Sequence, residues 1–241
     1  MVRVVTWKSR PGASRPHSSG YGVRWKSDHQ AQRWTGWRSW QTSPRDRSRI
    51  HSAFTDEHFA AGFAVTMHEL PERVRRALRD VADFPKPGVV FKDITPLLAD
   101  AELFVAITEA LAEPFAANGI THVAGVESRG FILAAPVAQS LGAGFVPIRK
   151  PGKLPWRAAG RDYGLEYGTD RLEVHVDACS ADSRVLIVDD VLATGGTAAA
   201  AAMLMEDIGG TVVGFSFLLW LTALQGDQRL TGRRVETLLK V

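Results

Sequence analysis

The feature that most constrains the fold is the run from Val185 to Thr197. It begins with four apolar residues, which predict a buried strand, and two aspartates stand where that strand ends. A Thr-Gly-Gly-Thr turn follows, and the alanine-rich stretch after it predicts the start of a helix. Strand, turn and helix in such close succession predict an α/β protein.

The same run predicts a site for a phosphate monoester beside a sugar. Backbone N–H groups and the positive end of the helix dipole favour an anion at the turn, and Gly195 and Gly196 let the backbone approach it closely. Asp189 and Asp190 can bind ribose hydroxyls or join a magnesium shell. An ordinary strand–turn–helix crossover is the alternative. The run is not a nucleotide-binding P-loop, because no lysine follows the second glycine.

Composition limits the classes of protein that this chain can belong to. Its 241 residues, 45% of them hydrophobic, can bury one good core and carry an appendage. We expect no membrane span, because no apolar run reaches the length of about eighteen residues that crosses a bilayer. The single cysteine, Cys179, rules out an intramolecular disulfide and favours a cytoplasmic location. No spacing typical of a zinc site or a nucleophilic triad is present.

The first 66 residues differ from the rest of the chain. They carry a net charge of +7, against −4 for residues 67–241, and they hold five of the seven tryptophans. We expect 1–66 to be a disordered extension or a start-site artefact with the natural start at Met67, and 67–241 to be one domain. A basic arm that binds nucleic acid and a transit peptide are the alternatives. The acidic balance of the domain gives no reason to expect nucleic-acid binding.

From Met67 onward the hydrophobic pattern becomes regular. Helices are predicted over residues 69–79, 101–117, 131–141 and 197–208. Strands are predicted over residues 122–126, 145–148, 172–176, 185–188 and 211–219. This alternation predicts a mostly parallel sheet that helices cover on both faces, with ligands beyond the carboxyl ends of its strands.

Two further segments carry groups that suit such a ligand. Segment 84–98 is rich in proline and glycine and predicts a rigid loop that presents backbone groups and Phe91 to a flat base. Its alternative is a plain connector. Arg129 stands at the head of a predicted helix, where a guanidinium can bind phosphate oxygens in a bidentate manner. A solvated loop arginine is the alternative there.

A third segment combines cations with a carboxylate. Arg149, Lys150 and Lys153 surround a Pro-Gly turn that opens a loop without regular structure as far as Arg161. Such a loop suits a diphosphate and a lid that excludes water, although a charge run is also typical of a solvated face. Glu166 follows between aromatic and apolar neighbours, so closure of the lid would raise its pKa, as general acid–base work requires. Its alternative is a surface glutamate.

In this order the four segments resemble the adenine phosphoribosyltransferases, from about Asp83 to Leu224. The run that ends at Thr197 is shared by all type I phosphoribosyltransferases, which use 5-phosphoribosyl-1-pyrophosphate (PRPP). The other segments are more particular to the adenine enzymes: Phe-Pro-x-Pro-Gly-Val-x-Phe-Lys-Asp-Ile-Thr-Pro-Leu, Glu-Ser-Arg-Gly-Phe, and Arg-Lys-x-Gly-Lys-Leu-Pro with Leu-Glu-Tyr-Gly.

The resemblance implies a fold, a reaction and a role for each site residue. The fold is the type I fold, a mostly parallel sheet flanked by helices with a small hood, and the reaction converts adenine and PRPP to AMP and pyrophosphate. The resemblance assigns the 5′-phosphate and ribose to Asp189, Asp190, Ala193, Thr194, Gly195, Gly196 and Thr197. It assigns pyrophosphate to Arg129, Arg149, Lys150 and Lys153, adenine to Val90, Phe91 and Lys92, and acid–base catalysis to Glu166. The resemblance implies Mg²⁺ as a cofactor that is bound mainly through the substrate. It also implies a homodimer, in which the residue at the position of Arg149 often reaches across the interface.

Three departures and two rival functions accompany this resemblance. The first 66 residues have no counterpart in it. The lid from Trp156 to Arg161 is bulkier and more cationic than the family pattern, and the chain after Leu224 is weakly matched. The first rival is the same chemistry on hypoxanthine, guanine, xanthine or orotate. The second is a non-catalytic regulator that senses PRPP or purines. The lid cations and Glu166 argue against a regulator, which has little use for them.

Overall fold

The computed structural model describes residues 68–165 and 168–241. Residues 1–67 and 166–167 lie outside this description. The predictions for the N-terminal extension and for Glu166 therefore fall outside the described residues. Within the described part of the chain, no helix is long and apolar enough to span a membrane.

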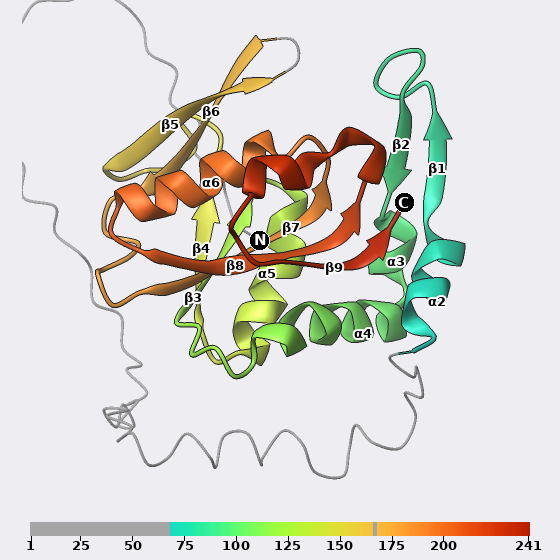
Figure 1. Cartoon of the computed structure of the whole chain (residues 1–241), viewed down its shortest axis with the longest axis horizontal. Helices are drawn as coiled ribbons and strands as arrows, with labels where there is room; N and C mark the ends of the chain where they lie inside the picture. The colour runs from blue at the N-terminus through green and yellow to red at the C-terminus, as the bar shows by residue number, and fades with distance from the viewer. Residues whose placement is uncertain (1–67, 166–167) are drawn as a thin grey trace, which may run out of the picture. The chain divides into compact units, whose positions relative to one another are not determined.

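A five-stranded parallel sheet in the order β4-β3-β7-β8-β9 forms the centre of the domain (Figure 1). The predicted parallel sheet is thereby confirmed, and four of its strands overlap predicted ones. The fifth, β9, was not predicted. The strands are β3 His122–Val126, β4 Gly144–Ile148, β7 Arg184–Leu192, β8 Thr211–Trp220 and β9 Val235–Lys240.

Strand β7 shows why this sheet can be read from the sequence. Successive side chains of a strand point to opposite faces, and here both faces are covered. Leu186 and Val188 belong to one core cluster, whereas Val185 and Ile187 belong to the other, and all four are fully buried. A strand buried on both faces has to be continuously apolar, which is the pattern that predicted it.

Helices cover the two faces of the sheet (Figure 1). α4 and α5 pack on one face together with α2 and α3, and α6 packs on the other. The four predicted helices are confirmed, but their bounds differ: α2 and α4 end before the predicted residue, whereas α5 and α6 both begin and end one or two residues earlier than predicted. The helices are α2 Leu70–Ala77, α3 Thr95–Ala99, α4 Ala101–Ala112, α5 Arg129–Ser140 and α6 Gly196–Asp207, with 3₁₀ turns at Glu113–Phe115, Thr222–Leu224 and Gly226–Leu230.

A two-stranded antiparallel hairpin, which we call the hood, precedes α3 (Figure 1). It consists of β1 Arg79–Ala82 and β2 Val90–Asp93. The predicted helix over 69–79 is wrong beyond Ala77, because the next residue is extended and Val81 pairs with Phe91 of β2. Part of the predicted loop 84–98 is likewise β2 and α3. Pairing with a distant strand overrides the local helical pattern here.

A second hairpin, which we call the ribbon, consists of β5 Ala158–Leu165 and β6 Gly168–His175. The prediction that the chain lacks regular structure as far as Arg161 is therefore wrong from residue 158. The predicted strand 172–176 exists, but it lies in the ribbon rather than in the parallel sheet. A two-residue bridge, Arg149 with Glu173, joins the ribbon to the end of β4.

We expect Leu204→Ala to destabilise the domain by about 2–5 kcal/mol, because it leaves a cavity where α6 packs on the sheet. Leu204 is 1% exposed, whereas its neighbour Met203 is 37% exposed. Met203→Ala is the matched control and should cost less than about 1 kcal/mol. Urea unfolding measures both, and equal losses of stability would contradict this packing of α6.

Candidate active site

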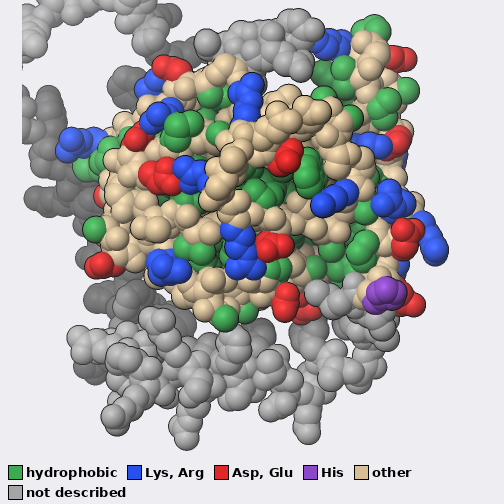
Figure 2. Space-filling model, in the orientation of Figure 1, with side chains coloured by type: hydrophobic (Ala, Val, Ile, Leu, Met, Phe, Trp, Pro, Cys, Tyr) green, Lys and Arg blue, Asp and Glu red, His purple; other side chains and the backbone are tan. Residues whose placement is uncertain are grey.

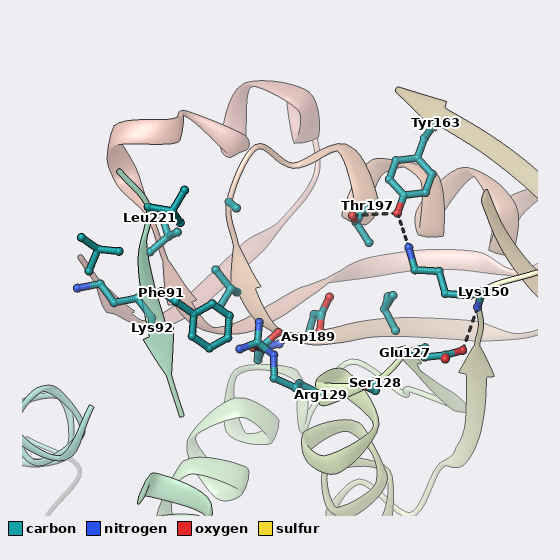
Figure 3. A pocket seen from close by; sticks show the side chains of 16 residues that line it. Phe91, Lys92, Glu127, Ser128, Arg129, Lys150, Tyr163, Asp189, Thr197 and Leu221 are labelled. Carbon is teal, nitrogen blue, oxygen red and sulfur yellow. Dashed lines mark hydrogen bonds and ion pairs between the residues drawn. The ribbon is translucent and has the colours of Figure 1, made fainter. Parts of the chain in front are cut away.

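A cavity of about 360 Å³ lies beyond the carboxyl ends of β3 and β7 (Figure 3). Its walls come from β2 of the hood, from residues 126–129, from Lys150 and Tyr163, and from the end of β7 with Thr197. The sequence predicted that ligands bind at this end of the sheet. The cavity thus brings together segments that are far apart in the chain.

The floor of the cavity holds the aspartate pair, Asp189 and Asp190. Asp190 is only 5% exposed, and its N–H donates to Asp189 Oδ1 at 2.9 Å. Arg129 Nε lies 2.8 Å from Asp190 Oδ2, but its N–H does not point along that line. Asp190 Oδ2 is therefore buried and ion-paired, with no hydrogen-bond donor among the described residues.

The two carboxyl groups hold protons more tightly than free carboxyls do. Burial raises the pKa of Asp189 well above its ordinary value, and the neighbouring charge of Asp190 raises it further. Burial also raises the pKa of Asp190, which the charge of Arg129 partly offsets. A second cation or a set of hydroxyl donors in the cavity would stabilise the ionised form of the pair.

The turn that the sequence predicts to bind phosphate, Ala193–Thr197, lies next to the aspartate pair, and we call it the phosphate turn. Helix α6 begins at Gly196, and Gly195 before it has φ +77° and no side chain with which to cap the helix. A Cβ at Gly195 would collide with the carbonyl oxygen of Gly226, so the position requires glycine. The first N–H groups of α6 consequently remain available to an anion. A further cavity of about 60 Å³ lies against this turn.

Lys150 reaches the cavity from the loop that follows β4 (Figure 3). Its ammonium donates to Asp170 and, at 3.2 Å, to Tyr163 Oη. Burial opposes the charge of Lys150, but these hydrogen bonds keep its pKa above the ordinary value. The backbone N–H of Lys150 donates to Glu127 Oε2 at 3.0 Å and lowers the pKa of Glu127, with Arg149 adding to the effect against burial.

Arg149 and Lys153 contact other groups. Arg149 Nε donates to Glu127 Oε2 at 3.1 Å, and its guanidinium carbon lies 6.0 Å from the centre of the Phe131 ring. Arg149 also donates to the carbonyl oxygen of Lys153 at 3.1 Å. These contacts direct Arg149 along the outside of α5 rather than into the cavity, which Arg129 and Lys150 line.

The hood supplies the opposite wall through Val90, Phe91 and Lys92. The Phe91 ring stands edge-on to Phe84 at 5.1 Å, and the guanidinium of Arg129 lies 4.9 Å from its centre. The ammonium of Lys92 is paired with Asp80 at 2.8 Å, so its side chain is already occupied within the hood.

Most of the predicted site residues meet in this cavity or at the turn beside it. Seven residues of its wall were not predicted as binding residues: Val89, Val126, Glu127, Ser128, Tyr163, Val191 and Leu221. Val89, Glu127 and Ser128 stand inside quoted motifs, so motif position could have indicated them. Leu221 follows the end of β8, and only the register of the sheet brings it here.

Comparison with known proteins decides the family. A model of the phosphoribosyl transferase domain matches residues 94–230. An adenine phosphoribosyltransferase of Myxococcus xanthus is 59% identical over 162 residues, which are 67% of this chain and 88% of the relative. The chain belongs to the adenine phosphoribosyltransferase family. One from Acidothermus cellulolyticus is 54% identical over 72% of this chain and 98% of its own length.

Solved adenine phosphoribosyltransferases confirm the type I fold. The enzyme from Rhodothermus marinus aligns with a TM-score of 0.70 at 52% identity and covers 72% of this chain and 99% of its own. That from Saccharomyces cerevisiae, solved with adenine and an imino-altritol bisphosphate, aligns with a TM-score of 0.68 at 38% identity over 71% of this chain and 99% of its own.

We expect Asp189→Asn to stabilise the fold at neutral pH. The raised pKa of Asp189 means that the folded protein keeps a proton that the unfolded chain releases at lower pH. The stability from this proton is complete below the ordinary carboxyl pKa of about 4 and is lost as the pH rises to the folded value. Asparagine does not ionise and should raise the free energy of unfolding at pH 7 by about 0.5–2 kcal/mol.

Urea unfolding at pH 7 and at pH 3 tests this expectation. The gain should be present at pH 7 and absent at pH 3, and Asp182→Asn at an exposed position is the control. An Asp189→Asn protein that is less stable than the parent by the same amount at both pH values would show that the carboxyl pKa is not raised.

Proposed function

We propose that the chain transfers the phosphoribosyl group of PRPP to adenine, which forms AMP and releases pyrophosphate in purine salvage. The observation that carries this proposal is one cavity lined by the aspartate pair, Thr197 of the phosphate turn, two cations and the aromatic wall of the hood. Family membership supports the same reaction.

The phosphate turn would bind the 5′-phosphate, because the first N–H groups of α6 and its dipole favour a dianion there. Asp189 and Asp190 would accept hydrogen bonds from the ribose hydroxyls. The buried Oδ2 of Asp190 supports this role, since a hydroxyl would supply the donor that no described residue gives it.

The edge of β2 would bind adenine. The hood has two strands, so one side of β2 has no partner strand within the hood. Val90 and Lys92 are two residues apart, so their backbone groups point to the same side of β2. These groups would read the base by hydrogen bonds while Phe91 packs against its face. The adenine found in the Saccharomyces cerevisiae enzyme agrees with a base site in this fold.

Arg129 and Lys150 would neutralise the pyrophosphate as it leaves. The ribose then passes through a cation-like state, so the protein has to fix the sugar, neutralise the leaving group and exclude water. No covalent nucleophile is needed. Arg129 is already placed between the aspartate pair and Phe91, which puts its charge beside both the sugar and the base.

We further propose a homodimer in which Arg149 serves the neighbouring subunit, with Lys153 beside it. Arg149 follows β4, an edge strand of the sheet, and points away from its own cavity. Ile132 on α5 and Phe145 on β4 are 42% and 38% exposed, so these elements offer apolar area to a second copy.

Magnesium fits the site through the substrate. In the part of the chain that the structure describes, no three His, Cys, Asp or Glu side chains are grouped to bind a metal ion. The buried Oδ2 of Asp190, which accepts no hydrogen bond from a described residue, is nevertheless a suitable ligand atom for such an ion. Asp189 and Asp190 would hold Mg²⁺ together with oxygens of PRPP, and the ion would help to neutralise the pyrophosphate.

Two proposals concern the rest of the chain. We propose that residues 1–66 are an extension outside the enzyme domain 67–241, which the family match from residue 94 onward supports. Mass spectrometry of the native N-terminus tests this. We also propose a cytoplasmic location, which the single cysteine favours.

Substrate competition tests the function. With PRPP fixed, adenine should be converted to AMP at least about 100-fold more efficiently than hypoxanthine, guanine, xanthine or orotate, because a site built for one hydrogen-bond pattern leaves groups unpaired with another. If another base is converted as efficiently as adenine, the assignment of adenine as the substrate is wrong. A protein that binds PRPP and converts no base would be a regulator.

We expect Glu166→Gln to lower kcat by about 100-fold or more and to leave the KM for PRPP nearly unchanged, as is typical when a general acid–base group is lost. Steady-state kinetics of AMP formation measure both constants, and an unchanged unfolding midpoint controls for folding. Normal turnover in this variant would exclude Glu166 from the proton transfer.

A further inference from the structure

Four segments meet at one hydroxyl group, that of Tyr163 on β5. Figure 3 shows two of its partners, Lys150 and Thr197. Lys150 Nζ donates to Tyr163 Oη at 3.2 Å, and Thr197 Oγ1 donates to it at 3.4 Å. Tyr163 Oη in turn donates to Asp170 Oδ2 at 3.0 Å. The hydroxyl of Tyr163 therefore connects Lys150 and the phosphate turn to the ribbon.

Asp170 completes this cluster from the other strand of the ribbon. Tyr163 and Asp170 are cross-strand partners, and the ammonium of Lys150 donates to the Asp170 carboxylate. The side chains of Lys150 and Asp170 are 37% and 27% exposed, so solvent screens the pair only in part. Glu166 lies between these partners in the sequence, after the last residue of β5 and outside the described residues.

We propose that Asp170 is a positioning residue that holds the ammonium of Lys150 in the free enzyme and gives it up to the pyrophosphate group of PRPP. The inference rests on the proposed function, in which Lys150 binds that group. Asp170 and the pyrophosphate oxygens are anionic acceptors for the same ammonium, so they compete for it. Asp170 thereby lowers the affinity for PRPP and pyrophosphate, and it aids release of the product.

The same exchange links substrate binding to the ribbon. When Lys150 leaves Asp170, Tyr163 loses one of its donors and the ribbon loses one of its ties to the loop after β4. The contact of Tyr163 with Thr197 remains, at the turn that would bind the 5′-phosphate. Occupation of the cavity therefore changes what holds the strands on either side of Glu166.

Asp170→Asn tests the proposal, because asparagine keeps the size and an acceptor oxygen and removes the charge. We expect the KM for PRPP and the Kd for pyrophosphate to fall about three- to fivefold, the effect of removing one partly screened ion pair. The KM for adenine should stay unchanged. Isothermal titration with pyrophosphate measures the Kd without turnover.

Asp162→Asn is the matched control. Asp162 lies on the same ribbon and pairs with Arg171 at 3.0 Å, and its side chain is 69% exposed. This variant should leave the KM for PRPP and the Kd for pyrophosphate within about twofold of the parent, because exposed ion pairs contribute little free energy. An equal fall in both variants would assign the effect to the general charge of the ribbon and overturn the proposal.

Lys150→Met separates this inference from the proposed function. It should weaken pyrophosphate binding, and Asp170→Asn should then have no further effect in the double variant. If Lys150→Met weakens pyrophosphate binding but Asp170→Asn leaves it unchanged or weaker, only the role of Asp170 is overturned. Normal binding in Lys150→Met would instead remove Lys150 from the pyrophosphate site, and the inference with it.

Discussion

The site depends on one electrostatic constraint, the burial of two adjacent carboxyl groups near the end of a strand. Asp189 and Asp190 follow four fully buried residues within β7; Asp190 is 5% exposed and Asp189 is partly exposed, so the sheet holds the pair largely out of water. Arg129 compensates for this in part from the head of α5. The remaining cost is met by the protons that the raised pKa values retain, or by a ligand that supplies hydrogen-bond donors or positive charge.

The central sheet and the phosphate turn could be predicted because their signals are local. Strand β7 is apolar on both faces, and the glycine before α6, Gly195, is required by its positive φ and by the backbone of Gly226 against it. The hood and the ribbon could not be predicted in the same way. Segment 158–165 has no apolar alternation, and it becomes a strand because it pairs with β6. Pairing between segments is a tertiary effect that no short window contains.

The cations of the site also show what the sequence could predict and what it could not. The sequence indicated Arg129, Arg149, Lys150 and Lys153 by type, but not which of them face the cavity. Lys150 does so because Glu127 binds its backbone and Tyr163 and Asp170 bind its ammonium. Arg149 is directed elsewhere by the other contact of Glu127. One carboxylate thus orients two neighbouring cations in different directions, a choice that depends on the end of β3 lying beside β4.

The contact between Gly226 and Gly195 has a consequence for the end of the chain. The segment after Leu224 was expected from the sequence to match the family weakly, and its backbone packs directly on the turn that would hold the 5′-phosphate. Strand β9 then anchors that segment to the edge of the sheet. The segment around Gly226 therefore acts as a mechanical support for a turn about thirty positions earlier, and a side chain at position 226 would displace that turn, because it would collide with the backbone of Ala193.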